Sequence, residues 1–258
     1  QKELLGLVKS VCFSPEDLDL VRGDPSERRS FLDQLLIQQS PRLAGVISDY
    51  ERALKQRNSL LKSRAPESSL RSWSEHLATF GGELIAGRIK LINQIEPLFQ
   101  IAYKNLSAKK LAKLGYKSSI PAPSSEKEVN KEVMLKVIEE VKSQEIERGI
   151  SLVGPHRDDL ILNLGDHPVK GYASHGESWS IALALRLASY QLFINEGAKP
   201  ILILDDVFSE LDEGRREKLL EIADSAEQTF ITVAVENDLP KAIQGARFKV
   251  ELGKVVTL

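Results

Sequence analysis

The stretch ILILDDVFSELD, residues 201–212, decides the fold class of this 258-residue chain. Four apolar residues, two of them β-branched, follow Pro200 and run directly into two adjacent carboxylates, Asp205 and Asp206. A short unbroken apolar run is typical of a strand buried in a parallel sheet. The run therefore predicts an α/β fold in which Asp205 and Asp206 lie at the carboxyl edge of the sheet, where such sheets bind ligands.

The two carboxylates are expected to differ in role, because adjacent strand residues point to opposite faces. In phosphate-transfer ATPases an aspartate at a strand end holds Mg²⁺, which bridges the β- and γ-phosphates. Residues 201–206 therefore predict a Walker B strand, with one carboxylate on the metal and the other facing the reaction. The alternative is a strand that ends in two solvated acids, which cap the next helix.

The composition limits the environment and the partners of the chain. The formal net charge is -2, so any contact with nucleic acid must come from a local basic patch. Cys12 is the single cysteine, which excludes an internal disulfide and a Cys-rich zinc site and predicts a reducing, cytoplasmic location. The most apolar expected helix, residues 181–194, is too short to cross a bilayer and contains Arg186, so no membrane association is expected.

Two long helices are predicted in the first half of the chain. From Leu43 onward, apolar residues recur in alternating three- and four-residue steps, with Arg57 in one polar slot of the seam. The spacing stops at residues 63–69, which contain Pro66, and then resumes as far as Phe99. Two such helices joined by a short linker predict an antiparallel coiled-coil hairpin.

Residues 99–118 form the most basic segment, with two tyrosines and no acid. A solvated helix face is one explanation. A DNA contact is the other, because tyrosines between lysines allow bases to stack. The candidate DNA-binding residues are Lys104, Lys109, Lys110, Lys113 and Lys117.

A helix and a polar turn follow. Ser125 and Glu128 have the spacing of a capping box, and valines at four-residue intervals from Val129 predict the buried face of a helix that ends at Gly149. Two strands, residues 150–153 and 160–164, are expected to flank the turn GPHRDD. A plain turn needs no function, and a zinc site at this turn would need further ligands.

The segment YASHGE, residues 172–177, precedes a helix that is apolar on nearly every face and must therefore be buried. Ser174 and Glu177 have the spacing of a capping box. The same geometry suits an anion, because a serine hydroxyl and free N–H groups at a helix start, with Gly176 permitting close approach, bind phosphate. Both interpretations are open at this point.

Taken together, a Ser-x-Gly-Glu helix start, an apolar strand ending in Asp205 and Asp206, and Ser-Glu-Leu-Asp at residues 209–212 resemble the ABC-type ATPase heads of the SMC and RecF group. Within this group, the runs VCFSPEDLDLVRGDPSERRSFLD, GPHRDDL, YASHGE and LDDVFSELD resemble the RecF family of DNA-repair proteins. The resemblance implies a partial ABC-type head with a P-loop NTPase-like sheet. Residues 1–25 and 197–258 would belong to ATPase lobe I, and residues 26–196 would form a mainly helical lobe II that carries the coiled-coil hairpin.

The resemblance also implies a role for each matching residue. Asp205 would be the Mg²⁺ ligand and Asp206 the catalytic carboxylate. The signature motif, which binds nucleotide held by a second head, would comprise Ser174, Gly176 and Glu177. The D-loop at the dimer interface would comprise Ser209, Glu210, Leu211 and Asp212.

Such heads form homodimers around ATP and separate on hydrolysis. The family resemblance implies an ATP- and Mg²⁺-dependent DNA clamp in recombinational repair, replication restart and the SOS response. This clamp would help to load recombinase at single-strand gaps or junctions, with RecO- and RecR-like partners. The alternative is a non-catalytic, SMC-like scaffold that dimerises and binds DNA without ATP turnover.

The sequence departs from the family pattern in three places. The P-loop pattern G-x-x-x-x-G-K-[ST] is absent, and the nearest match, residues 82–89, lacks its lysine and hydroxyl and lies in a helical pattern. We expect the P-loop upstream of Gln1 and no ATPase activity in this fragment alone. Thr232, Ala234 and Glu236 occupy the region of the switch histidine of ABC transporters, and Ser178 and Trp179 replace a basic residue and a glutamine common in signature helices.

Overall fold

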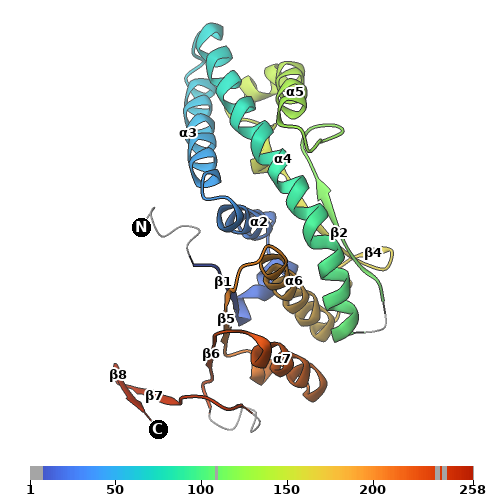
Figure 1. Ribbon diagram of the computed structural model, residues 1–258. Helices are drawn as coiled ribbons and strands as arrows, with labels where there is room; N and C mark the ends of the chain where they lie inside the picture. The colour runs from blue at the N-terminus through green and yellow to red at the C-terminus, as the bar shows by residue number, and fades with distance from the viewer. Residues whose placement is uncertain (1–7, 108–109, 236–238, 240–242, 258) are drawn as a thin grey trace.

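The computed structural model describes residues 8–107, 110–235, 239 and 243–257. The predicted strand is present as β5 (Ile201–Asp205), which lies between two parallel neighbours in a three-stranded sheet. Its even-numbered leucines are buried, whereas Ile201 and Ile203 are only partly covered, so in this chain one face of the strand is packed more fully than the other. The neighbours are β1 (Ser10–Phe13) and β6 (Thr229–Thr232), and α7 (Glu213–Ser225) connects β5 to β6 (Figure 1).

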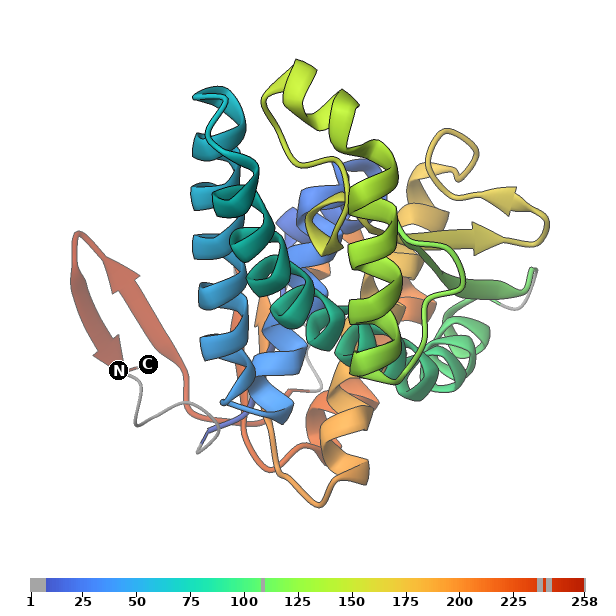
Figure 2. The same ribbon diagram turned by 90° about the horizontal axis from the view of Figure 1, so that it is seen from above.

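The apolar helix predicted after the YASHGE segment is α6 (His175–Asn195), and it is buried on nearly all sides. It packs against β1, against α1 (Leu18–Arg22) and against the long helix α4 (Glu67–Leu106). Trp179 of α6 meets Phe13 of β1 edge to face, with 5.8 Å between the ring centroids. Because α6 contacts both the sheet and the helical part of the molecule, it fixes one against the other (Figures 1 and 2).

The predicted coiled-coil hairpin is confirmed. Helices α3 (Leu43–Lys62) and α4 lie side by side and run in opposite directions, joined by residues 63–66 (Figure 1). At 1.5 Å per residue, α4 is about 60 Å long. Gly82 lies inside α4, where an added Cβ would come within 2.7 Å of the Lys127 carbonyl oxygen, so this glycine allows close packing of the next helix. The near match to a P-loop is therefore part of a continuous helix.

The basic segment and the region after Gly149 differ from expectation. Residues 112–117 form a strand, β2 (Ala112–Lys117), which pairs antiparallel with β3 (Asp159–Leu164), and β3 pairs with β4 (His167–Pro168). The strand predicted at residues 150–153 is wrong, because side chains take its backbone donors. The N–H of Ser151 donates to Asn58 Oδ1 at 2.7 Å, and the N–H of Leu152 donates to Glu145 Oε1 at 2.7 Å.

Helix α5 (Lys127–Arg148) ends before Gly149 as predicted, but the predicted capping box is wrong. Glu126 is the N-cap residue, and Asn130 closes the turn by accepting from the Ser124 N–H at 2.8 Å. The buried face also differs, since Val129 is exposed and α5 buries residues 130, 134, 138 and 145. The remaining regular elements are α2 (Pro25–Gln39), the short 3₁₀ turns Pro15–Asp17, Pro155–Arg157 and Phe208–Glu210, and the hairpin strands β7 (Phe248–Glu251) and β8 (Lys254–Thr257).

The β7–β8 hairpin projects away from the other elements (Figures 1 and 2). Its apolar side chains are largely exposed, including Val250 at 71% and Leu252 at 99%. An isolated two-stranded hairpin is marginally stable in water at best. Within the described residues, no helix has both the length and the apolar character that crossing a membrane requires.

The GPHRDD turn is a buried junction. Asp158 is fully buried and accepts hydrogen bonds from the Tyr116 hydroxyl at 2.5 Å, the Ser118 hydroxyl at 3.2 Å and the Ser119 N–H at 2.6 Å. Asp159 accepts two hydrogen bonds from the Arg28 guanidinium, from Nε to Oδ1 at 2.8 Å and from Nη2 to Oδ2 at 2.9 Å. The ionisable side chains of this turn therefore tie β2 and α2 to the start of β3.

Two further residues extend this junction to the hairpin. Arg88 of α4 donates to the carbonyl oxygen of Pro155 at 2.7 Å and pairs with Asp33 of α2. His156 accepts from the Tyr50 hydroxyl at 2.6 Å, and its Nε2 lies 3.2 Å from the Ser151 carbonyl oxygen. Burial lowers the pKa of His156 to about 4, so the imidazole is neutral at pH 7 and its Nε2–H donates to Ser151.

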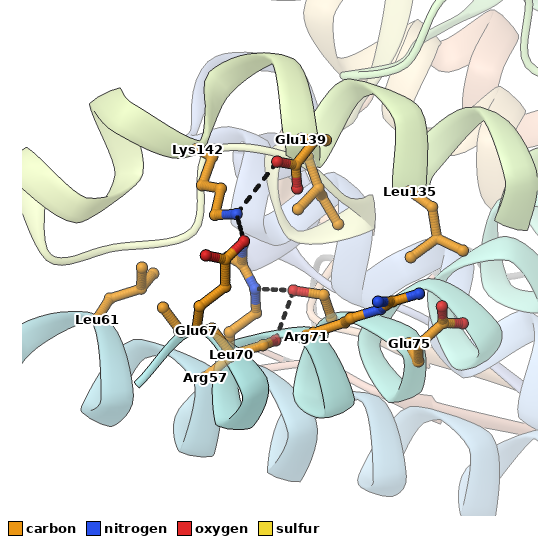
Figure 3. A pocket seen from close by; sticks show the side chains of 11 residues that line it. Arg57, Leu61, Glu67, Leu70, Arg71, Glu75, Leu135, Glu139 and Lys142 are labelled. Carbon is orange, nitrogen blue, oxygen red and sulfur yellow. Dashed lines mark hydrogen bonds and ion pairs between the residues drawn. The ribbon is translucent and has the colours of Figure 1, made fainter. Parts of the chain in front are cut away.

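Arg57, placed by the sequence in a polar slot of the coiled-coil seam, is 2% exposed. Its guanidinium donates to Ser74 at 2.9 Å, to Ser151 at 2.8 Å and to Glu145 at 2.5 Å. Figure 3 shows Arg57 among the residues that line a pocket between α3, α4 and α5, together with Lys142 and its two partners, Glu67 and Glu139. The buried pair of Arg57 and Glu145 joins the hairpin to α5.

We expect Glu145→Ala to destabilise the chain by about 3–5 kcal/mol, because it leaves the Arg57 charge buried and unpaired. Replacing both residues with methionine should recover most of the loss, since an apolar pair carries no desolvation penalty. Arg52→Ala, which removes an exposed pair with Asp49, should change stability by about 0.5 kcal/mol or less. Urea unfolding of the four proteins measures this, and an unchanged midpoint for Glu145→Ala would contradict it.

Candidate functional site

Asp205 and Asp206 lie together at the carboxyl edge of the parallel sheet, as the sequence predicted. Asp205 is the last residue of β5 and is paired in register with Thr232, the last residue of β6. Asp206 has a φ of 52°, in the left-handed region, which aspartate tolerates better than most residues other than glycine. The backbone therefore leaves the extended conformation of β5 at Asp206, directly after the last strand residue.

Thr232 anchors both acidic residues. Its hydroxyl donates to Asp205 Oδ1, and its carbonyl and hydroxyl oxygens accept from the Asp206 N–H at 3.1 and 3.2 Å. The Ala234 N–H donates to Asp206 Oδ1 at 3.3 Å. In the sequence, Thr232 stands out only by its place near the switch-histidine region. Its role as a support for the carboxylates follows from the parallel pairing of β5 with β6, which places it opposite Asp205.

The donor atoms at this edge fit magnesium. Carboxylate and hydroxyl oxygens are hard ligands, and Mg²⁺ is usually held by one or two carboxylates together with waters and substrate phosphates. In the described part of the chain, no group of three or more His, Cys, Asp and Glu residues has the arrangement of a metal site. Asp205 and Asp206 could therefore supply part of a magnesium shell, but these side chains alone do not form a complete one.

The predicted capping box at the start of α6 is confirmed. Ser174 N–H donates to Glu177 Oε2 at 2.9 Å, and Glu177 N–H donates to Ser174 Oγ at 3.3 Å. Lys110 pairs with Glu177 Oε1 at 2.9 Å. The backbone hydrogen bond from Ser174, with help from Lys110, lowers the pKa of Glu177 to about 2. A Cβ added to Gly176 would meet only the Arg215 guanidinium, at 3.7 Å, so this glycine leaves room beside the helix start.

The two residues that depart from the family pattern support this loop from behind. The Ser178 hydroxyl donates to the Ser174 carbonyl oxygen at 2.9 Å and accepts from Arg22 at 3.3 Å. Trp179 is buried and donates its indole N–H to His175 Nε2 at 3.0 Å. These contacts hold the helix start in place without the more usual basic residue and glutamine.

The segment from Ser209 to Asp212 follows the carboxylates as a short 3₁₀ turn and a helix cap. The Ser209 hydroxyl donates to the Asp206 carbonyl oxygen at 3.2 Å, and Leu211 is buried. Asp212 caps α7 by accepting from the Arg215 N–H at 3.0 Å. The side chain of Glu210 lies outside the described part of the structure.

The candidate residues therefore fall into two groups, the carboxylates at the edge of β5 and the helix start of α6. Among the described contacts, no hydrogen bond or ion pair joins Asp205 or Asp206 to Ser174 or Glu177. Arg215 is the residue that sequence reasoning missed. It follows the D-loop segment and reaches the helix start of α6, 39 residues earlier in the sequence.

The five candidate DNA-binding lysines do not share one element. Lys104 is in the last turn of α4, Lys113 and Lys117 are exposed on one face of β2, and Lys110 pairs with Glu177, while Lys109 lies outside the described residues. The tyrosines of this segment cannot stack with bases as placed. Tyr103 is buried, and the Tyr116 hydroxyl donates to the buried Asp158.

Comparison with known proteins identifies the family. No protein-family model matches the chain. The DNA replication and repair protein RecF of Streptomyces avermitilis is 50% identical over 266 residues, which cover 98% of this chain and 71% of that protein. RecF of Beutenbergia cavernae is 47% identical over 289 residues, covering 99% of this chain and 73% of the relative.

Solved structures of the recombination mediator protein RecF in the RecFOR pathway have the same fold. A RecF-ATPrS structure superposes with a TM-score of 0.90 at 27% identity, over all of this chain and 70% of that chain. A RecF-ATP structure gives a TM-score of 0.87 at 27% identity, over 99% of this chain and 69% of the other. On these sequence and structural matches, the chain belongs to the RecF family of DNA replication and repair proteins.

Proposed function

We propose that this chain carries the Walker B, D-loop and signature parts of an ATP-dependent DNA clamp that acts in recombinational repair. The observation that carries the proposal is the anchored pair of Asp205 and Asp206 at the edge of the parallel sheet, followed directly by a D-loop-like turn. The same chain is 50% identical to a RecF, and its fold matches that of a RecF-ATP structure. An ATP site at this sheet edge fits both facts.

Within this proposal the two carboxylates have separate tasks. Asp205 binds Mg²⁺, and the Thr232 hydroxyl fixes one of its carboxylate oxygens. A Mg²⁺ ion held there would offset the negative charge that develops during phosphoryl transfer. Asp206, whose Oδ1 accepts from the Ala234 N–H, orients or deprotonates the attacking water.

The signature motif completes the site of a second head. Ser174, Gly176 and Glu177 lie at the amino end of a 21-residue helix, where N–H groups and the helix dipole favour an anion. The open space beside Gly176 allows a phosphate of the partner's nucleotide to approach. ATP would thus join two copies, and hydrolysis would release them. RecO- and RecR-like proteins are the proposed further partners, since the matching RecF structures belong to the RecFOR pathway.

A non-catalytic scaffold is the second candidate function. It holds if the protein carries no pattern G-x-x-x-x-G-K-[ST], which these 258 residues do not contain. A chain without a P-loop would bind DNA and dimerise without turning over ATP. The two functions differ in whether Asp205 and Asp206 affect nucleotide chemistry.

The deciding experiment uses this chain fused to the amino-terminal segment of its Streptomyces avermitilis relative, where the resemblance places the P-loop; we call this protein the P-loop fusion. In it, Asp206→Asn should still bind ATP and dimerise, while hydrolysis falls by about 10²-fold or more, as expected for loss of a general base. Asp205→Asn should weaken Mg²⁺-dependent ATP binding and dimerisation together, because it removes a metal ligand.

Calorimetric titration, analytical ultracentrifugation and phosphate release separate these outcomes. Asp224→Asn, an exposed acid on α7, serves as the matched control and should behave as the parent does. If the Asp206→Asn protein hydrolysed ATP at the same rate as the parent, the catalytic assignment of Asp206 would be wrong. A parent fusion that binds DNA but never hydrolyses ATP would favour the scaffold.

DNA contact is proposed for the exposed face of β2. Lys113 and Lys117 are four residues apart on a strand, so they share a face, and neither has an ion-pair partner among the described residues. Asp159, which pairs with Lys117 in the strand register, is occupied by Arg28. Both ammonium groups are therefore available for phosphates.

Replacing Lys113 and Lys117 with alanine should weaken DNA binding regardless of sequence. It should also reduce the slope of log K against log salt by about 0.9 for each phosphate that the protein no longer neutralises. Fluorescence anisotropy over a salt series measures this in the P-loop fusion. The control is a double replacement of Lys55 and Lys136, two exposed lysines on α3 and α5. Equal salt slopes for the two double variants would assign the β2 lysines to solvated surface.

A further inference from the structure

Arg215, on the first turn of α7, lies between the D-loop segment and the helix start of α6. Its Nη1 donates to Asp212 Oδ2 at 2.6 Å, and its backbone N–H donates to Asp212 Oδ1 at 3.0 Å, so one residue engages both oxygens of the last D-loop carboxylate. Both Nη1 and Nη2 lie 3.7 Å from the position of a Cβ on Gly176. The guanidinium therefore bonds to the last D-loop residue and lies beside the space that Gly176 leaves open.

Within the described part of the chain, the guanidinium of Arg215 makes one hydrogen bond, from Nη1 to Asp212. The Arg215 side chain is 20% exposed, and its Nε is buried without a hydrogen-bond partner among the described residues. A buried donor without an acceptor costs stability, and such groups in native proteins call for a specific explanation. A residue needed only to cap α7 would not need to place its guanidinium beside Gly176, because the bonds to Asp212 already satisfy the cap.

We propose that Arg215 is a positioning residue that couples the D-loop to the signature glycine within one head. The inference rests on the proposed function, in which both motifs meet a second copy. Contact of the D-loop with that copy changes the position of Asp212, and the guanidinium bonded to Asp212 moves with it. The space beside Gly176 then changes, so that nucleotide binding at the signature motif depends on contact between the D-loop and the partner.

The shape of the side chain is central to this role. A guanidinium is a planar fork whose Nη1 and Nη2 can face Asp212 and Gly176 at the same time, whereas an ammonium group is a single point of charge. Arg215→Lys therefore keeps the charge near the start of α7 but cannot reach both residues. Arg215→Gln removes the charge as well. If the residue serves only to balance the charge of Asp212, lysine restores function.

The test compares Arg215→Lys, Arg215→Gln and the parent in the P-loop fusion, with Lys218→Ala, an exposed cation of the same helix, as control. We expect the Mg²⁺-ATP affinity of the monomeric head to stay within twofold of the parent. ATP-dependent dimerisation should weaken at least tenfold in both Arg215 variants and stay within twofold in the control. Calorimetry and sedimentation give the two constants, and thermal unfolding checks that each variant is folded.

A double-mutant cycle with Gly176→Ala tests the coupling itself. If Arg215 acts through the signature glycine, the double variant Gly176→Ala/Arg215→Gln should lose less dimerisation affinity than the product of the two single fold-losses. The inference would be overturned if Arg215→Lys dimerised as tightly as the parent, or if the fold-losses of the two single variants multiplied fully in the double variant. Either result would leave the proposed clamp function standing. A parent fusion that does not dimerise with ATP would instead overturn the proposed function, and this inference with it.

Discussion

A buried carboxylate, Asp158, lies in the polar turn that joins β2, α2 and α4 to the start of β3. A charge taken out of water needs donors on its oxygens, and those of Asp158 come from Tyr116, Ser118 and Ser119, around the end of β2. The same short turn carries Asp159, which binds Arg28 of α2. The polar turn between α5 and β3 therefore acts as a junction. Its residues hold β2, α2 and α4 against the start of β3.

The position of the candidate site follows from this junction. Arg88 connects the turn to α4, and α4 packs along α6, whose amino end carries the signature residues. At its other side α6 meets the parallel sheet through Trp179 and Phe13, and the sheet presents Asp205 and Asp206. The two halves of the proposed nucleotide site are thus held by one buried helix. This arrangement suits a site that is completed by a second copy.

Local signals in the sequence were sufficient for the elements that bury their own residues. The apolar run before Asp205, the seam from Leu43 and the fully apolar α6 each follow from periodicity, because the spacing of apolar residues marks the buried face of an element whichever partner covers it. The strand β2 was missed although Ala112 and Leu114 alternate with lysines, since the lysines suggested a basic helix face. In this segment the alternation of buried and exposed residues predicts the strand correctly, whereas the positive charge does not.

Other features depend on partners far away in the chain and have no local signal. Asn130 and Glu145 are buried in α5 in place of the valines because Gly82 and Arg57, on the hairpin, supply their hydrogen bonds. For the carboxylates, the residue roles came from the family resemblance, and the structure added the anchoring by Thr232.

Under the proposed function, the signature face of this chain pairs with nucleotide held by another head. The most direct measurement is sedimentation velocity of the labelled 258-residue chain mixed with excess full-length RecF from Streptomyces avermitilis, with Mg²⁺ and either ATP or ADP. We expect a one-to-one complex with ATP and free chain with ADP, because in the proposed clamp ATP joins the two heads and its hydrolysis releases them. A labelled chain that sediments identically with both nucleotides would show that its signature face does not pair with nucleotide on another head.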